Sequence, residues 1–136
     1  KALEFYKKVL GLKVLIDDVL DKPETNHFLG RPHNARTRAT FVAGDHPFGK
    51  VALSHPINYE VPDKGERAQA PNIGYLAQSF LVSNLDDALK TCATIGADMY
   101  SQPVEINIPG DGIVRAGMVK NPGSGALMEL IEGTLS

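Results

Sequence analysis

Residues 83–132, SNLDDALKTCATIGADMYSQPVEINIPGDGIVRAGMVKNPGSGALMELIE, contain the plan of a complete helix-and-strand unit. Asn84 suits a helix start because its side chain can accept from the amide of Asp87, and Asp86 and Asp87 suit the positive end of the helix dipole. Gly96 suits the end of that helix, since glycine readily adopts the left-handed conformation found after helices. The runs after it that are rich in strand-forming residues are 97–104, 113–119 and 126–131.

The first part of the chain repeats this plan. An amphipathic helix is predicted over residues 1–10, ended by Gly11, and a polar, irregular segment is expected at residues 21–36. The strands predicted in this part are 12–20, 37–43 and 50–55, and a further predicted strand, 73–82, opens the second part. The repeated order indicates an α+β fold made of two βαβββ modules.

The predicted domain organisation is one domain of 136 residues. Module one covers about residues 1–56, a linker rich in proline and charge covers about 57–72, and module two covers about 73–136. The first module lacks its opening strand, which is expected before Lys1. This organisation places a site between the two modules.

Composition excludes some classes of function. A net charge of −2 gives no basic footprint for nucleic acid, and no apolar run is long enough to cross a bilayer. We therefore expect no nucleic-acid or membrane partner and a cytoplasmic location. Cys92 is the single cysteine, and its place beside Leu89 and Ile95 in a predicted helix favours a buried, inert thiol over a catalytic one.

Glu129 is the acidic residue inside the last apolar run, and it is the first candidate for chemistry. Burying a carboxylate is costly unless it is paired or binds a cation. One interpretation is therefore a metal ligand or general base. The other is an ion pair with a neighbouring cation such as Arg115.

Residues 21–38 carry several cationic and imidazole side chains. Arg36 and Arg38 could clamp the carboxylate or phosphate of an anionic small molecule, because a guanidinium donates two parallel hydrogen bonds. The other interpretation is an ordinary solvated loop. The other residues of this group are His27, Arg31 and His33.

Several of these segments together resemble the vicinal-oxygen-chelate superfamily. This superfamily includes glyoxalases, bleomycin and fosfomycin resistance proteins, extradiol dioxygenases and methylmalonyl-CoA epimerases. Residues 2–12 (ALEFYKKVLGL) resemble its helix-to-strand signature. The second-module pattern is matched by 85–89 (LDDAL), 96–97 (GA), Arg115 and 121–132 (NPGSGALMELIE).

The resemblance implies that the two modules form a curved, cup-shaped mixed sheet. It also implies a divalent metal (Zn, Ni, Mn, Co or Fe) bound by His, Gln or Glu from the first and last strands of each module. Glu129 matches the final-strand position. The corresponding first-module position falls on Leu53, which cannot ligate, and His55 lies two residues further on the same side of the strand. The opening-strand position of module two falls on Ala77, with Gln78 beside it.

The resemblance leaves three functions open. The first is a metal-assisted lyase or isomerase that acts on a small oxygenated metabolite, with Glu129 and His55 as ligands or acid–base groups and Arg36, Arg38, Arg115 and Gln78 as substrate contacts. An iron-dependent dioxygenase needs two histidines and a carboxylate as metal ligands. This reaction is disfavoured because the sequence does not place two histidines at the matching positions. The second is a metal-free drug- or metabolite-binding protein of bleomycin-resistance type. The third is a metal-free enzyme that uses residues 21–38. The resemblance also implies a homodimer.

Overall fold

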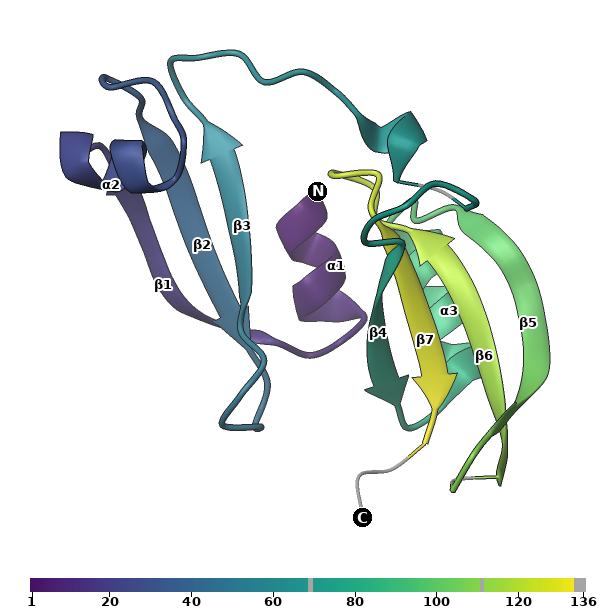
Figure 1. Cartoon of the computed structure of the whole chain (residues 1–136). Coiled ribbons are helices and arrows are strands. Elements are labelled where there is room, and N and C mark those ends of the chain that lie inside the picture. The colour runs from purple at the N-terminus through teal and green to yellow at the C-terminus, as the bar shows by residue number, and fades with distance from the viewer. Residues whose placement is uncertain (69, 111, 134–136) are drawn as a thin grey trace. The chain divides into compact units, whose positions relative to one another are not determined.

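The computed structural model describes residues 1–68, 70–110 and 112–133, which form two compact units (Figure 1). The large unit consists of Lys1–Leu10 and Lys64–Ser136, and the small unit of Gly11–Asp63. The expected module boundaries differ from these units at the N-terminus, because residues 1–10 were assigned by sequence to module one. No helix in the described part of the chain is long and apolar enough to span a membrane.

The large unit contains a four-stranded mixed sheet with one helix inserted after its first strand. The strand order is β4-β7-β6-β5; β4 runs parallel to β7, and the other neighbours are antiparallel. This is a βαβββ unit, so the predicted α+β fold is confirmed. The elements are β4 (Ala77–Val82), α3 (Leu85–Thr94), β5 (Met99–Ile108), β6 (Gly112–Lys120) and β7 (Leu127–Glu132).

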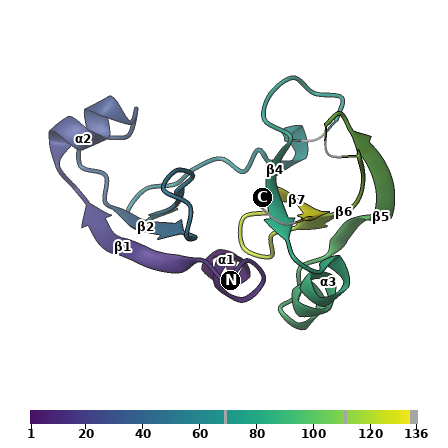
Figure 2. The same cartoon turned by 90° about the horizontal axis from the view of Figure 1, so that it is seen from below.

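The helices α1 (Ala2–Lys8) and α3 pack on one face of this sheet, which we call the helix face (Figure 2). A Cβ on Gly117 would touch Leu85 and Leu89 of α3, so β6 lies close beneath that helix. The Tyr6 hydroxyl of α1 donates to Gln78 of β4 at 2.8 Å. Burial of apolar side chains between helices and sheet is the main stabilising term. The fully buried apolar side chains here include Phe5, Leu85, Cys92, Val119, Met128 and Leu130.

The start of α3 follows its sequence signal. Asn84 has an extended backbone, and its side-chain oxygen accepts from the Asp87 amide at 2.9 Å. Asp86 and Asp87 lie in the first turn. Cys92 is 1% exposed, and burial raises the pKa of its thiol to about 11. The predicted cap and the predicted buried thiol are both confirmed.

The small unit contains three antiparallel strands in the order β1-β2-β3. The predicted irregular segment also contains a short helix, α2, which the sequence analysis missed. Pro23 begins this helix, where its missing N–H costs nothing. The elements are β1 (Lys13–Leu20), α2 (Pro23–Phe28), β2 (Thr37–Ala43) and β3 (Val51–Pro56); a 3₁₀ turn, η1 (Gly65–Arg67), lies in the predicted linker and belongs to the large unit.

Candidate functional site

The two faces of the large unit's sheet carry different residues. Successive side chains in a strand point to opposite faces, so the contacts with α1 and α3 assign both faces. Gly117 and Arg115 of β6, and Gln78 of β4, lie on the helix face. The opposite face, here called the distal face, carries Ala77, Ser79, Leu81, Leu127, Glu129, Ile131, Ala116, Met118 and Lys120.

Glu129 lies half-buried in the middle of the distal face. Ser79 is its register partner on β4, and the Ser79 hydroxyl donates to Glu129 Oε2 at 2.5 Å. The rows on either side are apolar across this strand pair, with Ala77 opposite Leu127 and Leu81 opposite Ile131. Within the described residues no ion pair involves Glu129. The carboxylate is therefore held by one hydroxyl and is available to a ligand.

Arg115 does not neutralise Glu129, because it lies on the helix face. Its guanidinium binds Asp86 at 2.8 Å and approaches Glu132 at 3.5 Å. The hydrogen bonds with Asp86 raise the pKa of Arg115 and lower that of the Asp86 carboxyl. Arg115 thus ties α3 to the sheet, and its predicted role in substrate binding stays a prediction.

Gln78 also lies on the helix face, away from Glu129. Its Oε1 accepts the hydrogen bond from Tyr6, whose hydroxyl lies 4.0 Å from Met128 Sδ as well. Burial raises the pKa of the Tyr6 hydroxyl, so it remains a proton donor at neutral pH. The opposite orientation of Ala77 and Gln78 agrees with the strand alternation expected from sequence. The assigned role of Gln78 in substrate binding is untested.

His55 and Arg38 belong to the small unit, where they are register partners on β3 and β2. Both are exposed, and Leu53 shares their face of the sheet. Arg38 does not project freely, because its Nε and Nη2 donate to the two carboxylate oxygens of Asp17 at 2.8 and 2.6 Å. Thr40 also donates to Asp17, at 2.9 Å.

The remaining cations of residues 21–38 are dispersed in the small unit. Arg31 Nη2 donates to Ser54 Oγ at 3.3 Å. The backbone N–H of Arg36 donates to Asn58 Oδ1 at 2.7 Å, and this residue is exposed. Asn26 is fully buried and donates to the carbonyl oxygens of His33 and Ala35, which fixes the loop after α2. The anion clamp predicted for Arg36 and Arg38 stays a prediction.

The residues around Glu129 are a poor match for the divalent metal that the resemblance implies. On the distal face of the β4–β7 pair, the described residues offer one carboxylate, Glu129, and one hydroxyl, Ser79, whereas a protein-bound transition metal usually takes three or more N, O or S ligands. In the part of the chain that the structure describes, no three His, Cys, Asp or Glu side chains gather. His55 lies in the other unit. Its predicted pairing with Glu129 stays a prediction.

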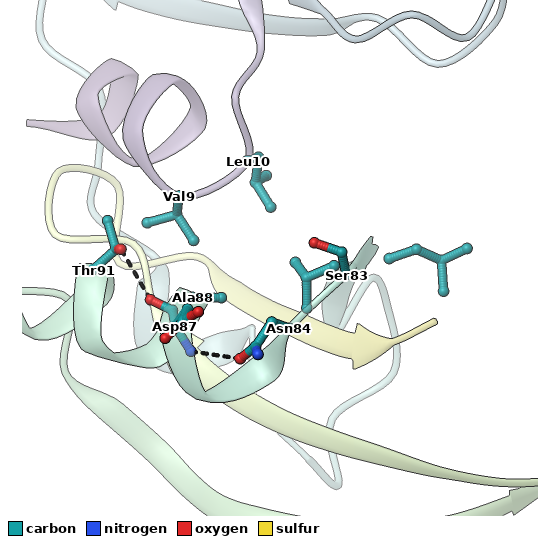
Figure 3. A pocket seen from close by; sticks show the side chains of 9 residues that line it. Val9, Leu10, Ser83, Asn84, Asp87, Ala88 and Thr91 are labelled. Carbon is teal, nitrogen blue, oxygen red and sulfur yellow. Dashed lines mark hydrogen bonds between the residues drawn. The ribbon is translucent and has the colours of Figure 1, made fainter. Parts of the chain in front are cut away.

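The described residues of the large unit line cavities in two places. One, of about 400 Å³, lies between the end of α1 and the start of α3 (Figure 3). Its polar groups are engaged locally, because Asn84 caps Asp87 and Thr91 donates to the Asp87 carbonyl. The other, of about 410 Å³, is lined mainly by apolar groups of the segment before β4 and the start of β7. It includes Ala77 and Leu127 of the distal face, one row from Glu129.

The Asp17–Arg38 contact predicts a pH response in the small unit. The hydrogen bonds from Arg38 and Thr40 hold the pKa of Asp17 at about 2, below its ordinary value of 3.8. A depressed pKa means that the contact stabilises the fold above pH 3.8 and that this contribution is lost as the pH falls towards 2. In an NMR titration we expect a carboxyl midpoint near 2 for Asp17 and a midpoint moved towards the ordinary value in Arg38→Met.

Arg36→Met is the matched control for this titration, because the Arg36 side chain has no contact with Asp17 among the interactions described above. It should leave the Asp17 midpoint unchanged. A wild-type midpoint close to 4 would show that the Asp17–Arg38 pair does not persist in solution.

Comparison with known proteins identifies the fold. No protein-family model matches the sequence, and no curated protein matches it. A glyoxalase family protein from Bacillus cereus is similar in structure, with a TM-score of 0.78 at 17% identity over 91% of this chain and 79% of that chain. A member of the glyoxalase/bleomycin resistance protein/dioxygenase superfamily from Sphaerobacter thermophilus gives 0.56 at 22% identity over 97% and 86%. A glyoxalase I mutant from Zea mays gives 0.60 at 13% identity over 98% and 41%. These likenesses confirm the predicted resemblance at the level of structure: the chain has the fold of the glyoxalase/bleomycin resistance protein/dioxygenase superfamily.

Proposed function

We propose that the distal face binds a small oxygenated metabolite and that Glu129 is the carboxylate that acts on it. The observation that carries this proposal is the state of Glu129, which is half-buried among apolar rows, held by Ser79 and without an ion pair in the described residues. A carboxylate in such surroundings is suited to accept a proton or to bind a cation.

The reaction class favoured by this arrangement is an isomerase or lyase. Glu129 would accept the proton of a carbon that bears a hydroxyl group and lies next to a carbonyl group, and would return it to the former carbonyl carbon. The hydroxyl proton passes to the former carbonyl oxygen, so the atoms balance as an isomerisation. The Ser79 hydroxyl orients the carboxylate, since it donates to Oε2 and leaves the other oxygen for the substrate. The glyoxalase names of the similar structures support this class for the present chain.

A metal-assisted form of the reaction requires ligands in addition to Glu129. His55 is the further ligand that the sequence predicts, and this assignment stays a prediction. No step of the proton transfer described above depends on a metal ion.

The alternative is a metal-free binding protein. The specific observation that favours it is the apolar character of Leu53 and Ala77, which occupy two positions where the resemblance implies ligands. The apolar cavity of about 410 Å³ beside Ala77 is within the size range of small-ligand sites.

Metal analysis of the purified wild-type protein and of Glu129→Gln distinguishes the metal-assisted reaction from the two metal-free alternatives. The protein is prepared without chelator or metal-affinity resin, soaked in Zn, Ni, Mn, Co or Fe, and analysed for its metal content. The metal-assisted form predicts a near-stoichiometric ion in the wild type and its loss in Glu129→Gln. Glu132→Gln is the matched control, because Glu132 lies on β7 but faces Arg115 and α3. Equal metal content in all three proteins would remove Glu129 from the ligand set.

A wild type without metal, combined with activity towards α-ketoaldehydes that Glu129→Gln abolishes, would support the metal-free reaction. Binding of such compounds without turnover would favour the binding protein. If Glu129→Gln keeps both the binding and the turnover of the wild type, the proposed role of Glu129 is wrong.

A further inference from the structure

Lys120 is a second charged side chain on the distal face. It is the last residue of β6 and the register partner of Leu127, while Met118 is the partner of Glu129. Lys120 and Glu129 are therefore diagonal neighbours on adjacent antiparallel strands, with Cα atoms about 7–8 Å apart. Two opposite charges at this spacing would ordinarily be expected to pair.

Their side chains are instead held by different neighbours. Lys120 Nζ lies over the ring of Tyr100 on β5, 5.6 Å from its centroid. Glu129 accepts from Ser79 on β4. Because β5 and β4 are the two outer strands of the sheet, the ammonium and the carboxylate lean towards opposite edges. Among the described residues neither group has an ion pair, and Met118 and Leu127 lie between them on the inner strands.

This arrangement has the features of a site for a molecule with two polar ends. In the described part of the chain the half-buried Lys120 has no anionic partner, Glu129 has no donor besides Ser79, and the surface between them is apolar. Met118 is suited to contact a flat ring, since thioether sulfur interacts favourably with aromatic groups. The apolar cavity lined by Tyr75, Leu76 and the Ala77–Leu127 pair adjoins the same row as Lys120.

We propose that the distal face binds a small aromatic acid that carries a hydroxyl group. Its carboxylate pairs with Lys120, its ring covers Met118 and borders the cavity, and its hydroxyl donates to Glu129. This inference rests on the proposed function and names the class of substrate or ligand. The charge-assisted contact with Lys120 fixes the orientation, because the other end of the site carries the opposite charge.

The test uses 3-(4-hydroxyphenyl)propanoate as the probe, with two relatives that each lack one feature. Its primary amide lacks the negative charge, and 3-phenylpropanoate lacks the hydroxyl. Binding is followed by NMR of methionine methyl groups in the intact chain. Met118 reports on the distal face, and the fully buried Met128 of the helix face is the internal reference.

We expect the acid to shift the Met118 signal with little change at Met128, and to bind roughly tenfold more tightly than its amide, as a charge-assisted hydrogen bond implies. Lys120→Met should remove this preference while leaving the affinity for the amide unchanged, and Lys120→Arg should retain it. Glu129→Gln should reduce the preference for the hydroxylated acid over 3-phenylpropanoate. Tyr100→Phe, which keeps the ring beneath Lys120, is the matched control and should bind as the wild type does.

Equal binding of acid and amide by the wild type would overturn the inference, as would an unchanged acid preference in Lys120→Met or the absence of any shift at Met118 up to the solubility limit of the probe. These outcomes leave the proposed role of Glu129 standing if its substitution still abolishes metal binding or turnover. If Glu129→Gln changes neither metal binding nor turnover while Lys120→Met still removes the preference for the acid, the distal face is a binding site without the proposed chemistry.

Discussion

Replacing Phe5 by alanine is expected to destabilise the large unit by about 3–5 kcal/mol, the range for removing a buried aromatic ring. Phe5 has no exposed surface, and its ring makes an edge contact with Tyr6 at 5.7 Å between centroids. The loss combines the transfer of the ring from the core with the cavity that it leaves. The effect also tests whether α1 forms part of the core of the large unit, as the contacts of Tyr6 with β4 and β7 indicate.

Urea unfolding followed by circular dichroism, together with hydrogen exchange at the amide of Leu130, measures this loss within the large unit. Leu130 is fully buried in β7, so its amide should exchange only on extensive opening. Phe48→Ala is the matched control, because Phe48 is 78% exposed and lies in the small unit. It should change the free energy of unfolding by no more than about 0.5 kcal/mol. A comparably small loss in Phe5→Ala would show that α1 is not part of that core in solution.

Features set by neighbouring residues could be predicted from the sequence. The start of α3 depends on the short-range contact between Asn84 and Asp87, and the structure confirms it. The thiol of Cys92 is buried because helical periodicity places it among apolar neighbours, as predicted. The short helix α2 was missed because six residues give too little periodicity to detect and because Pro23 is also a residue of turns.

The surroundings of Glu129 depend on strand pairing between distant residues. The sequence suggested Arg115 as a neighbour, but Met118 is the residue of β6 opposite Glu129. Arg115 is three positions from Met118, an odd number, so strand alternation places it on the other face. Ser79 was not predicted either, because its contact requires the parallel register between β4 and β7. Local patterns identify Glu129 as unusual, and only the register shows what lies beside it.

The loop between β6 and β7 is held by Asn121, and we expect Asn121→Ala to disturb both this loop and the register of β7. Asn121 is 1% exposed, and its Oδ1 accepts from the amides of Gly123 and Ser124 at 3.0 and 3.3 Å. Its Nδ2 donates to the carbonyl oxygen of Ala2 at 3.4 Å, which joins the loop to α1. Alanine leaves two amides and one carbonyl without these partners, at a cost of about 1–3 kcal/mol for each that stays buried.

The total loss expected for Asn121→Ala is therefore about 2–4 kcal/mol in the free energy of unfolding, measured in urea by circular dichroism. The loop positions the first residue of β7, so the variant should also alter the NMR signals of Met118 and Glu129 in the native state. Ser124→Ala is the control, because in the described part of the chain the Ser124 hydroxyl accepts one long bond, from the Ala126 amide at 3.3 Å, at an exposed position. If both variants unfold at the same urea concentration as the wild type, the Asn121 bonds do not stabilise the loop. If Asn121→Ala is destabilised while the Met118 and Glu129 signals stay in place, the register of β7 is set by its core residues instead.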